Sequence, residues 1–263
     1  MRVDVGEGLN LNYVEEGEGE AFVFTVGPGF EQTSQPDHLK LFSSRFRTIQ
    51  YDTRGSGKSD DSDWYSFKSG CDDLVELLRA LNIQKAIIYG GSSGGIQGLM
   101  FAYSYPEHVR ALIVDGTSTE INIIAAKNWR TFAEKTLLAG KDATEDMVLQ
   151  GAVRGGREGE FKVETALNPA RYDVRARFSL FLELSNLYEH PITPYLGDIT
   201  CPVLALHGED DKLVGPGGSV RISRAIPGSQ LRILPGCGHT VLATSPDTAK
   251  KEVLTFLDGL STI

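Results

Sequence analysis

The chain has 263 residues and a formal net charge of -9 at pH 7. That length fits one large domain, or one domain that carries an insertion. The acidic charge argues against a general affinity for nucleic acid or for anionic membranes, so neither is expected as a partner.

The three cysteines, Cys71, Cys201 and Cys237, stand at no paired or metal-type spacing, so reduced thiols are expected. The N-terminal segment has no apolar core of a signal peptide, and no apolar run approaches the ~18 residues of a membrane span. Together these features predict a cytoplasmic protein.

Short apolar runs alternate with amphipathic segments at both ends of the chain. Buried strands are predicted at residues 21–26, 46–52, 85–90, 110–116, 201–208 and 230–236. Helices are predicted at residues 71–83, 95–109, 218–228 and 247–260. Strands and helices that alternate at these lengths indicate an α/β fold with a doubly wound, mostly parallel sheet.

The middle of the chain differs, because residues 118–196 contain helix-like segments and no convincing strand. Helices are expected there at about 121–140, 144–153 and 175–188, with a loop at 154–160. We therefore predict a core made of residues 1–117 and 197–263, with residues 118–196 inserted as a helical cap above the sheet.

Two Gly-rich segments raise the question of a phosphate-binding loop. The segment "RGSGKSD" ends like a Walker A loop, but that motif requires glycine at the position held by Asp52. The segment "YGGSSGG" cannot be matched to G-x-G-x-x-G. It does match G-x-S-x-G, a sharp turn between a strand and a helix that displays a nucleophilic serine between very small residues. Ser92 and Ser93 both satisfy this rule.

A nucleophilic serine requires a base, and the base requires an acid that fixes its tautomer. His239, in the loop "PGCGHTV" after the last predicted strand, has the order and setting expected of the base. His207 is set aside because it lies too close in sequence to the acid to face it from another loop. The remaining histidines, set aside on position, are His38, His108 and His190.

The acid is expected after the strand at 201–208, where "GEDDKLV" offers Glu209, Asp210 and Asp211. Asp115, after the strand at 110–116, is another acid candidate, although an aspartate at a strand end is commonly structural.

Several motifs together resemble the α/β-hydrolase superfamily, and within it the esterase and proline-iminopeptidase type. They are "TVGPG", "YDTRGSGKSD", "GGSSGG", "HGEDDKLV" and "PGCGHTV". The resemblance implies Ser92 as nucleophile, Asp211 as acid and His239 as base. It further implies an oxyanion hole from the backbone N–H groups of Ser93 and Gly27, with no cofactor and no metal.

Two positions depart from the family's pattern. Thr25-Val26 stands where the family has His-Gly, and Ser93 stands where iminopeptidases usually have Trp. The second departure weakens the peptidase interpretation.

The aromatic residues of the cap are expected mainly to form the cap's own core, because isolated helices must bury an apolar face. Trp129 and Phe181 are predicted to face an apolar group of the substrate. The cap arginines, which include Arg175 and Arg177, are interpreted as solvated surface charge rather than as a carboxylate site.

The sequence thus predicts a serine hydrolase that cleaves a small carboxylic ester or lactone through an acyl-enzyme. One alternative is an iminopeptidase-like amide hydrolase, with Glu183 or Glu189 binding a substrate amino group. Another is a ligand sensor that has little turnover. Whether the chain acts alone or as a homodimer is left open.

Overall fold

The computed structural model describes residues 1–29, 31–33, 36–62, 65–154 and 174–260. Their strands form one eight-stranded sheet in the order β1-β2-β4-β3-β5-β6-β7-β8. The strands from β3 to β8 run parallel, whereas β1 and β2 form an antiparallel hairpin that joins the sheet through β4. The strands are β1 (Arg2–Asp4), β2 (Asn10–Glu16), β3 (Ala21–Thr25), β4 (Arg47–Tyr51), β5 (Ala86–Gly91), β6 (Val109–Asp115), β7 (Val203–Gly208) and β8 (Gln230–Leu234).

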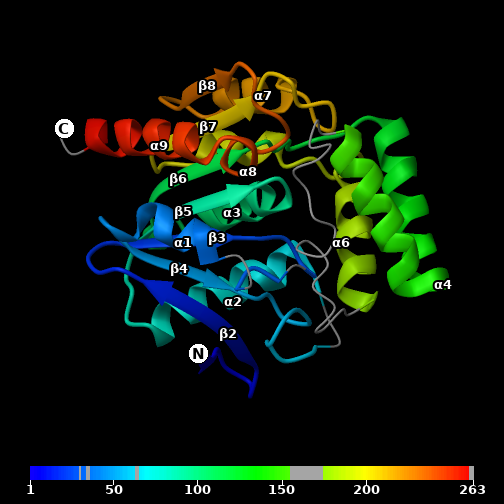
Figure 1. Cartoon of the computed structure of the whole chain (residues 1–263), viewed down its shortest axis with the longest axis horizontal. Coiled ribbons are helices and arrows are strands. Elements are labelled where there is room, and N and C mark those ends of the chain that lie inside the picture. Colours follow the sequence, from blue (N-terminus) through cyan, green and yellow to red (C-terminus); the bar gives the residue numbers. More distant parts are fainter. Residues whose placement is uncertain (30, 34–35, 63–64, 155–173, 261–263) are drawn as a thin grey trace.

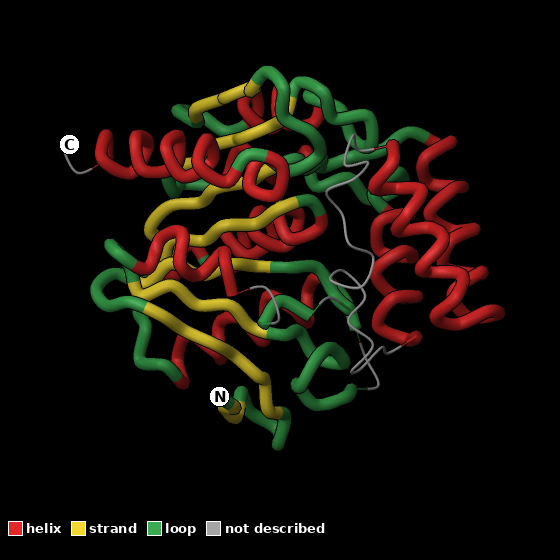
Figure 2. Tube along the Cα trace, in the orientation of Figure 1, coloured by secondary structure: helices red, strands yellow, loops and turns green. Residues whose placement is uncertain are grey.

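Helices cover both faces of this sheet (Figures 1 and 2). One apolar cluster joins the sheet to α2, α3 and the cap, and a second joins the opposite face to α1 and α9. The α-helices are α1 (Pro36–Ser43), α2 (Phe67–Ala80), α3 (Ser93–Ser104), α4 (Ile123–Arg154), α6 (Val174–Asn186), α7 (Gly217–Ala225), α8 (Val241–Thr244) and α9 (Pro246–Leu260). Two 3₁₀ turns are η1 (Pro106–His108) and η2 (Thr193–Asp198). The predicted doubly wound α/β fold is confirmed.

Several helices differ in their bounds from the sequence prediction. The helix predicted at 95–109 ends at Ser104, because Pro106 cannot continue its hydrogen bonds, and Pro106–His108 forms a separate turn. The helix predicted at 218–228 ends at Ala225. Helix α2 begins at Phe67 because Ser66 and Ser69 form a capping box, in which each side chain accepts a hydrogen bond from the other residue's backbone N–H. Helix α4 runs without a break where two helices were predicted. The predicted loop at 154–160 lies outside the described residues, except for the end of α4.

Helices α4 and α6 lie side by side beyond the carboxyl ends of the parallel strands, on the right of Figure 1. The chain leaves the core and returns to it at one point. There the Ile192 N–H donates to the Thr119 carbonyl over 2.9 Å, and the Thr119 and Thr193 hydroxyls lie 2.8 Å apart. The two ends of the insertion are therefore joined at the core.

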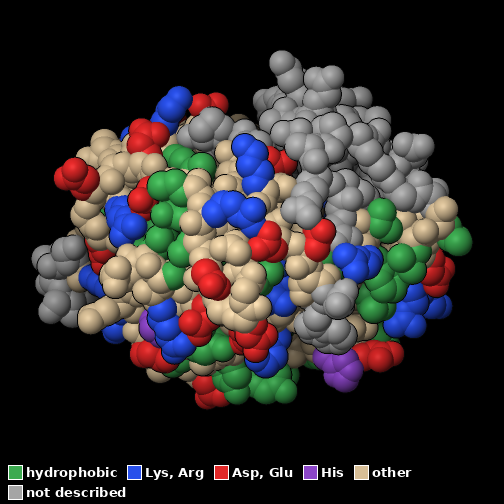
Figure 3. All heavy atoms as spheres, turned by 90° about the horizontal axis from the view of Figure 1, so that it is seen from below, with side chains coloured by type: hydrophobic (Ala, Val, Ile, Leu, Met, Phe, Trp, Pro, Cys, Tyr) green, Lys and Arg blue, Asp and Glu red, His purple; other side chains and the backbone are tan. Residues whose placement is uncertain are grey.

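Acidic and basic side chains are interspersed on the face seen in Figure 3, which shows no continuous patch of one sign among its coloured atoms. Among the described residues, no helix is both long enough and apolar enough to cross a bilayer.

Candidate active site

The stretch "YGGSSGG" forms a sharp turn between β5 and α3, and the two serines take different positions in it. Ser92 has φ 52° and ψ -120°, a left-handed conformation that is strained for a residue with a side chain. Its N–H donates to the Asp115 carbonyl on β6 over 2.8 Å. Ser93 is the first residue of α3. Ser92 therefore stands at the apex of the turn.

The glycines around Ser92 are required by close backbone contacts. A Cβ on Gly90 would lie 2.2 Å from the Gly94 carbonyl oxygen, and a Cβ on Gly94 would lie 2.2 Å from the Thr25 carbonyl oxygen. A Cβ on Gly91, by contrast, would meet nothing closer than a Thr240 methyl at 3.5 Å. In the pair that flanks Ser93, a Cβ on Gly95 would lie 2.8 Å from Thr117 Cβ, but Gly91 is open. Only the pair that flanks Ser92 is thus tight against the backbone at both positions.

A hydrogen-bonded series leads away from this serine. His239 Nε2 lies 2.9 Å from Ser92 Oγ, and His239 Nδ1 lies 2.9 Å from Asp211 Oδ2. His239 precedes α8 and Asp211 follows β7, so each comes from the carboxyl end of a strand or from the loop after it. The structure brings together the three residues that the resemblance implied, and it leaves Glu209 and Asp210 exposed.

The environment of Asp211 keeps its carboxyl ionised. Burial acts to raise its pKa, but hydrogen bonds from His207 and His239 outweigh burial and hold the pKa well below its usual value. The backbone N–H groups of Leu213 and Val214 also donate to Oδ1, over 2.7 and 3.1 Å.

His207, which was set aside as the base, does not take the place of His239 beside Ser92, but it contacts the acid directly, which the sequence interpretation did not expect. His207 Nε2 lies 2.8 Å from Asp211 Oδ2, and the His207 side chain is 0% exposed. The sequence argument assumed that a histidine must approach the acid from another loop. Here the turn after β7 folds the carboxylate back over the end of its own strand. The sequence did offer a signal for this contact, because a histidine stands at the end of a strand four residues before the acid.

Asp115, the other acid candidate, binds backbone N–H groups after His239 rather than the imidazole ring. Its carboxylate accepts hydrogen bonds from the N–H groups of Val241 and Leu242, both over 2.9 Å, and from the Tyr89 hydroxyl over 2.6 Å. Burial raises the pKa of Asp115, and these donors oppose the rise. Because the Asp115 carbonyl also accepts from Ser92, one residue ties the serine turn to the histidine loop.

The loop after β3 lies against the serine turn. A Cβ on Gly27 would come 2.5 Å from Ser93 Oγ, so the two predicted oxyanion residues are neighbours. Thr25, where the family has His, places its hydroxyl 2.9 Å from the Gly94 carbonyl. This contact explains how the loop is anchored without the family's histidine.

The predicted substrate residues Trp129 and Phe181 stack on each other, with ring centroids 5.7 Å apart and an interplanar angle of 11°. Phe132 packs edge-on against both rings. The aromatic cluster thus joins α4 to α6 and belongs to the cap's own packing, and a contact of Trp129 or Phe181 with substrate stays a prediction.

One cap arginine does not fit the prediction of solvated charge. Arg177 is only 4% exposed, and its Cδ would lie 3.1 Å from a Cβ on Gly29. Leu180, one turn further along α6, approaches Gly27 in the same way. Helix α6 therefore covers the loop that carries the predicted oxyanion donor, whereas Arg175 is exposed.

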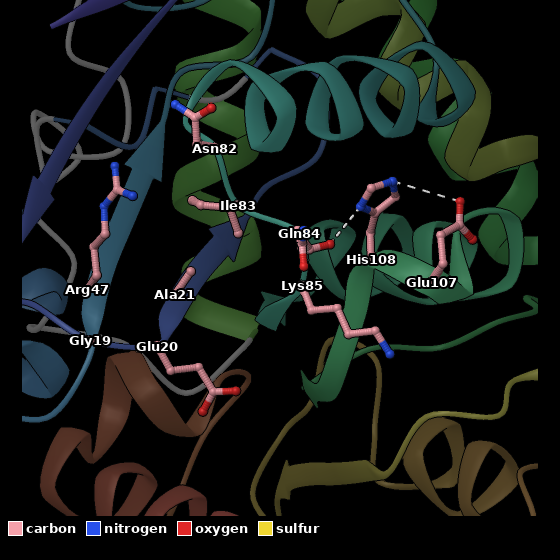
Figure 4. Close-up of a pocket in the computed structure, with 10 residues that line it drawn as sticks. All are labelled: Gly19, Glu20, Ala21, Arg47, Asn82, Ile83, Gln84, Lys85, Glu107 and His108. Carbon is pink, nitrogen blue, oxygen red and sulfur yellow. Dashed lines mark hydrogen bonds and ion pairs between the residues drawn. The ribbon is translucent and has the colours of Figure 1, made fainter.

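A separate concavity of about 760 Å³ lies at the opposite edge of the sheet (Figure 4). It is lined by residues at the amino ends of the parallel strands, among them Ala21, Arg47 and His108. Arg47 pairs with Glu15, and His108 Nδ1 bonds to the Gln84 carbonyl. Its lining residues include no serine, threonine or cysteine, so this concavity is a poor candidate for the serine chemistry described above.

The described residues hold no cluster of three or more His, Cys, Asp or Glu side chains suited to a metal ion. The three cysteines, all among the described residues, are free thiols.

Parallel strands that lead into such a serine turn, with a histidine and a carboxylate bonded behind the serine, are the arrangement of the α/β class of hydrolases. The chain belongs to the alpha/beta hydrolase fold family, because the family's sequence profile matches residues 28–246, well over half of its length.

Relatives and solved structures agree with this assignment. A 2-(acetamidomethylene)succinate hydrolase of Mesorhizobium japonicum is 29% identical over 269 residues, covering 98% of this chain and 95% of that protein. The serine hydrolase BPHL of Mus musculus is 26% identical over 269 residues, covering 95% and 84%. A solved hydrolase from Pseudomonas aeruginosa has a TM-score of 0.85 at 23% identity, covering 98% and 97%, which shows the same fold. These similarities support a hydrolase.

Proposed function

We propose that the protein is a serine hydrolase that cleaves a small carboxylic ester or lactone through an acyl-enzyme intermediate. The observation that carries the proposal is the unbroken hydrogen-bonded series from Ser92 through His239 to Asp211. A serine hydroxyl is a poor nucleophile until a base takes its proton, and this series supplies both the base and the acid that orients it.

In the proposed reaction, Ser92 Oγ attacks the carbonyl carbon while His239 Nε2 takes the hydroxyl proton. The N–H groups of Ser93 and Gly27 stabilise the oxyanion, and each such donor typically contributes ~3–4 kcal/mol in the transition state. His239 then returns the proton to the leaving alkoxide, or to the ring-opened oxygen of a lactone. Water, deprotonated by His239, cleaves the acyl-enzyme and regenerates Ser92.

The placement of the cap carboxylates does not favour the iminopeptidase-like alternative. Glu183 accepts a hydrogen bond from the Phe67 N–H over 2.9 Å, at the start of α2. Glu189 is exposed and lines a groove of about 580 Å³ together with Lys68 and Tyr195. Each carboxylate thus lies in a setting other than the serine turn, so the ester or lactone remains the preferred substrate.

The test combines active-site labelling with turnover. A fluorophosphonate probe followed by peptide mapping is expected to label Ser92, and p-nitrophenyl acetate and a small γ-lactone are expected to be hydrolysed. Ser92→Ala should abolish both labelling and turnover. Ser93→Ala is the matched control, because it keeps the backbone N–H and removes only a hydroxyl. A label on Ser93, or hydrolysis of prolyl p-nitroanilide in preference to the esters, would contradict the proposal, and absence of labelling and turnover would favour the ligand sensor.

A further inference from the structure

Two imidazole rings share one oxygen of the candidate acid. Asp211 Oδ2 lies 2.9 Å from His239 Nδ1 and 2.8 Å from His207 Nε2. The other oxygen, Oδ1, accepts the backbone N–H groups of Leu213 and Val214. The carboxylate is therefore held by four donors, and only one of them belongs to the catalytic series described above.

The protons on the two rings follow from the charge of the acid. An ionised carboxylate can only accept hydrogen bonds, so His239 Nδ1 and His207 Nε2 must both carry protons. In neutral His239 this leaves Nε2 without a proton and facing Ser92 Oγ, which is the tautomer that a general base requires. The state of Asp211 thus decides whether His239 is ready to act.

His207 is fixed at its other end by a second side chain. Its Nδ1 lies 2.8 Å from Ser219 Oγ on α7, and Ser219 Oγ lies 3.2 Å from the Leu206 carbonyl. The Ser219 hydroxyl has one proton, which it donates either to Nδ1 of a neutral His207 or to the Leu206 carbonyl when His207 is protonated. In both arrangements the proton stays on His207 Nε2, which donates it in a hydrogen bond to Asp211. His207 and Ser219 are fully buried, so water does not compete for these groups.

We propose, on the basis of the serine-hydrolase function argued above, that His207 is a positioning residue of the catalytic series. Together with Ser219 it holds Asp211 from the side opposite to His239. Asp211 thereby stays oriented, and His239 keeps the tautomer that accepts the Ser92 proton. His207 touches neither the substrate nor the serine, and it acts only through Asp211.

Three elements pack against this series, and two of them place charged side chains near it. Asp115, at the end of β6, faces the histidine loop through its bonds to Val241 and Leu242. The loop after β7 adds the exposed side chains of Glu209, Asp210 and Lys212. The facing residue of α7 is the uncharged Ser219. The substitutions below leave all of these charges in place, so a change in the pH profile reports on His207.

The test compares His207→Leu, which removes the donor to Asp211, with His207→Gln, whose amide nitrogen can replace Nε2 as a donor. For His207→Leu we expect kcat for p-nitrophenyl acetate to fall by roughly 10- to 100-fold, with KM changed by less than about 2-fold. With one donor fewer, Asp211 binds protonated His239 more strongly, so the acid limb of kcat/KM should move to higher pH. His207→Gln should recover most of the lost kcat. The low-field proton NMR resonance of His239 Nδ1–H should shift in the leucine variant and return toward its original position in the glutamine variant.

If His207 had a purely structural role, both substitutions would lower the melting temperature. The pH profile and the His239 NMR resonance of the folded fraction would then stay unchanged. That outcome overturns the proposal, as does full kcat in His207→Leu. If His207→Leu does not fold, Ser219→Ala decides, because it removes the group that fixes Nδ1. An unchanged kcat together with an unchanged resonance in that variant overturns the proposal.

Failure of the proposed function gives a different result. If the unsubstituted protein neither hydrolyses esters nor reacts with the fluorophosphonate, the hydrolase function fails before any variant is compared. If the unsubstituted protein is active and the histidine variants match it, only the role of His207 fails.

Discussion

The serine turn offers a matched pair of substitutions, Gly90→Ala and Gly91→Ala, that distinguishes between its two serines. Both positions lie at the end of β5 and both substitutions add one methyl group. At Gly90 the new Cβ would stand 2.2 Å from the Gly94 carbonyl oxygen, whereas at Gly91 it would stand 3.5 Å from a side-chain methyl. If Ser92 is the nucleophile, the first substitution should damage the site and the second should not.

The expected loss of stability in Gly90→Ala follows from the contact between the new Cβ and the Gly94 carbonyl oxygen. A separation of 2.2 Å is about 1 Å shorter than a normal van der Waals contact, and the opposing atom belongs to the backbone and cannot rotate away. Overpacking of this kind costs ~1–3 kcal/mol, which corresponds to a fall in melting temperature of roughly 2–12 °C for a chain of this size. Relief of the clash would displace Ser92 relative to His239, and a displacement of ~1 Å can lower the rate on the order of 100-fold. Gly91→Ala should be neutral, or stabilising by about 0.5 kcal/mol through the unfolded state.

Two measurements on the same samples check this prediction. Thermal unfolding followed by circular dichroism gives the change in stability, and the rate of fluorophosphonate labelling gives the competence of the nucleophile. Normal labelling by Gly90→Ala would refute the argument from the close contact. A greater loss in Gly91→Ala than in Gly90→Ala would place the apex of the turn at Ser93.

Four further predictions concern individual side chains. Asp211→Asn should lower kcat by on the order of 10³- to 10⁴-fold through the wrong histidine tautomer, as measured with p-nitrophenyl acetate. The folded state lowers the pKa of Asp211, so ionised Asp211 stabilises the protein at pH values above its unfolded pKa of about 3.9. This stabilisation is lost as pH falls through the pKa of Asp211 in the folded state. The stability difference between the unsubstituted protein and Asp211→Asn, measured by urea unfolding, should therefore stay constant above about pH 5 and shrink progressively as pH falls below it. A difference that stays constant down to about pH 3 would contradict the linkage. Burial raises the pKa of the Cys71 thiol and raises that of Cys201 to about 11, so both should react slowly with Ellman's reagent at neutral pH and rapidly after unfolding. Glu183→Ala leaves the Phe67 N–H without its cap partner and should lower the melting temperature by roughly 2–4 °C, whereas Glu183→Gln should retain most of the stability.

Most of the parallel part of the sheet could be predicted from sequence because the strands β3 to β7 are almost entirely buried and read as short apolar runs. The β1–β2 hairpin was missed for the opposite reason. Residues of β2, with the sequence NLNYVEE, are mostly polar or half-buried, and the hairpin lies at the edge of the sheet. Helix α1 was missed as well. Its eight residues follow the loop of the TVGPG motif, and the segment after that motif was not assigned any structure. Elements at the edge carry a weaker pattern than elements in the core.

The choice between Ser92 and Ser93 shows what local sequence rules leave open. Both serines have glycines two residues before and two residues after, so the rule of small neighbours accepts either one. The family resemblance implied Ser92, and backbone geometry separates the two serines independently, through the positive φ of Ser92 and the contact between Gly90 and Gly94. The missed role of His207 has a related cause, because sequence distance does not reveal that a tight turn returns the acid to the end of its own strand.

The candidate site is assembled at the carboxyl ends of the parallel strands, and backbone hydrogen bonds between these strand ends hold it there. β5 leads into Ser92, β6 ends at Asp115, and β7 leads through His207 to the acid. Asp115 connects these ends, since its carbonyl binds Ser92 N–H while its carboxylate binds the N–H groups that follow His239. The catalytic series thus depends on the register of neighbouring parallel strands, whereas α6 of the cap reaches it only over the loop at Gly27 and Gly29. The core should therefore set the chemistry and the cap the fit of the substrate, so that substitutions on α6 alter KM for bulky esters more than labelling by a small fluorophosphonate.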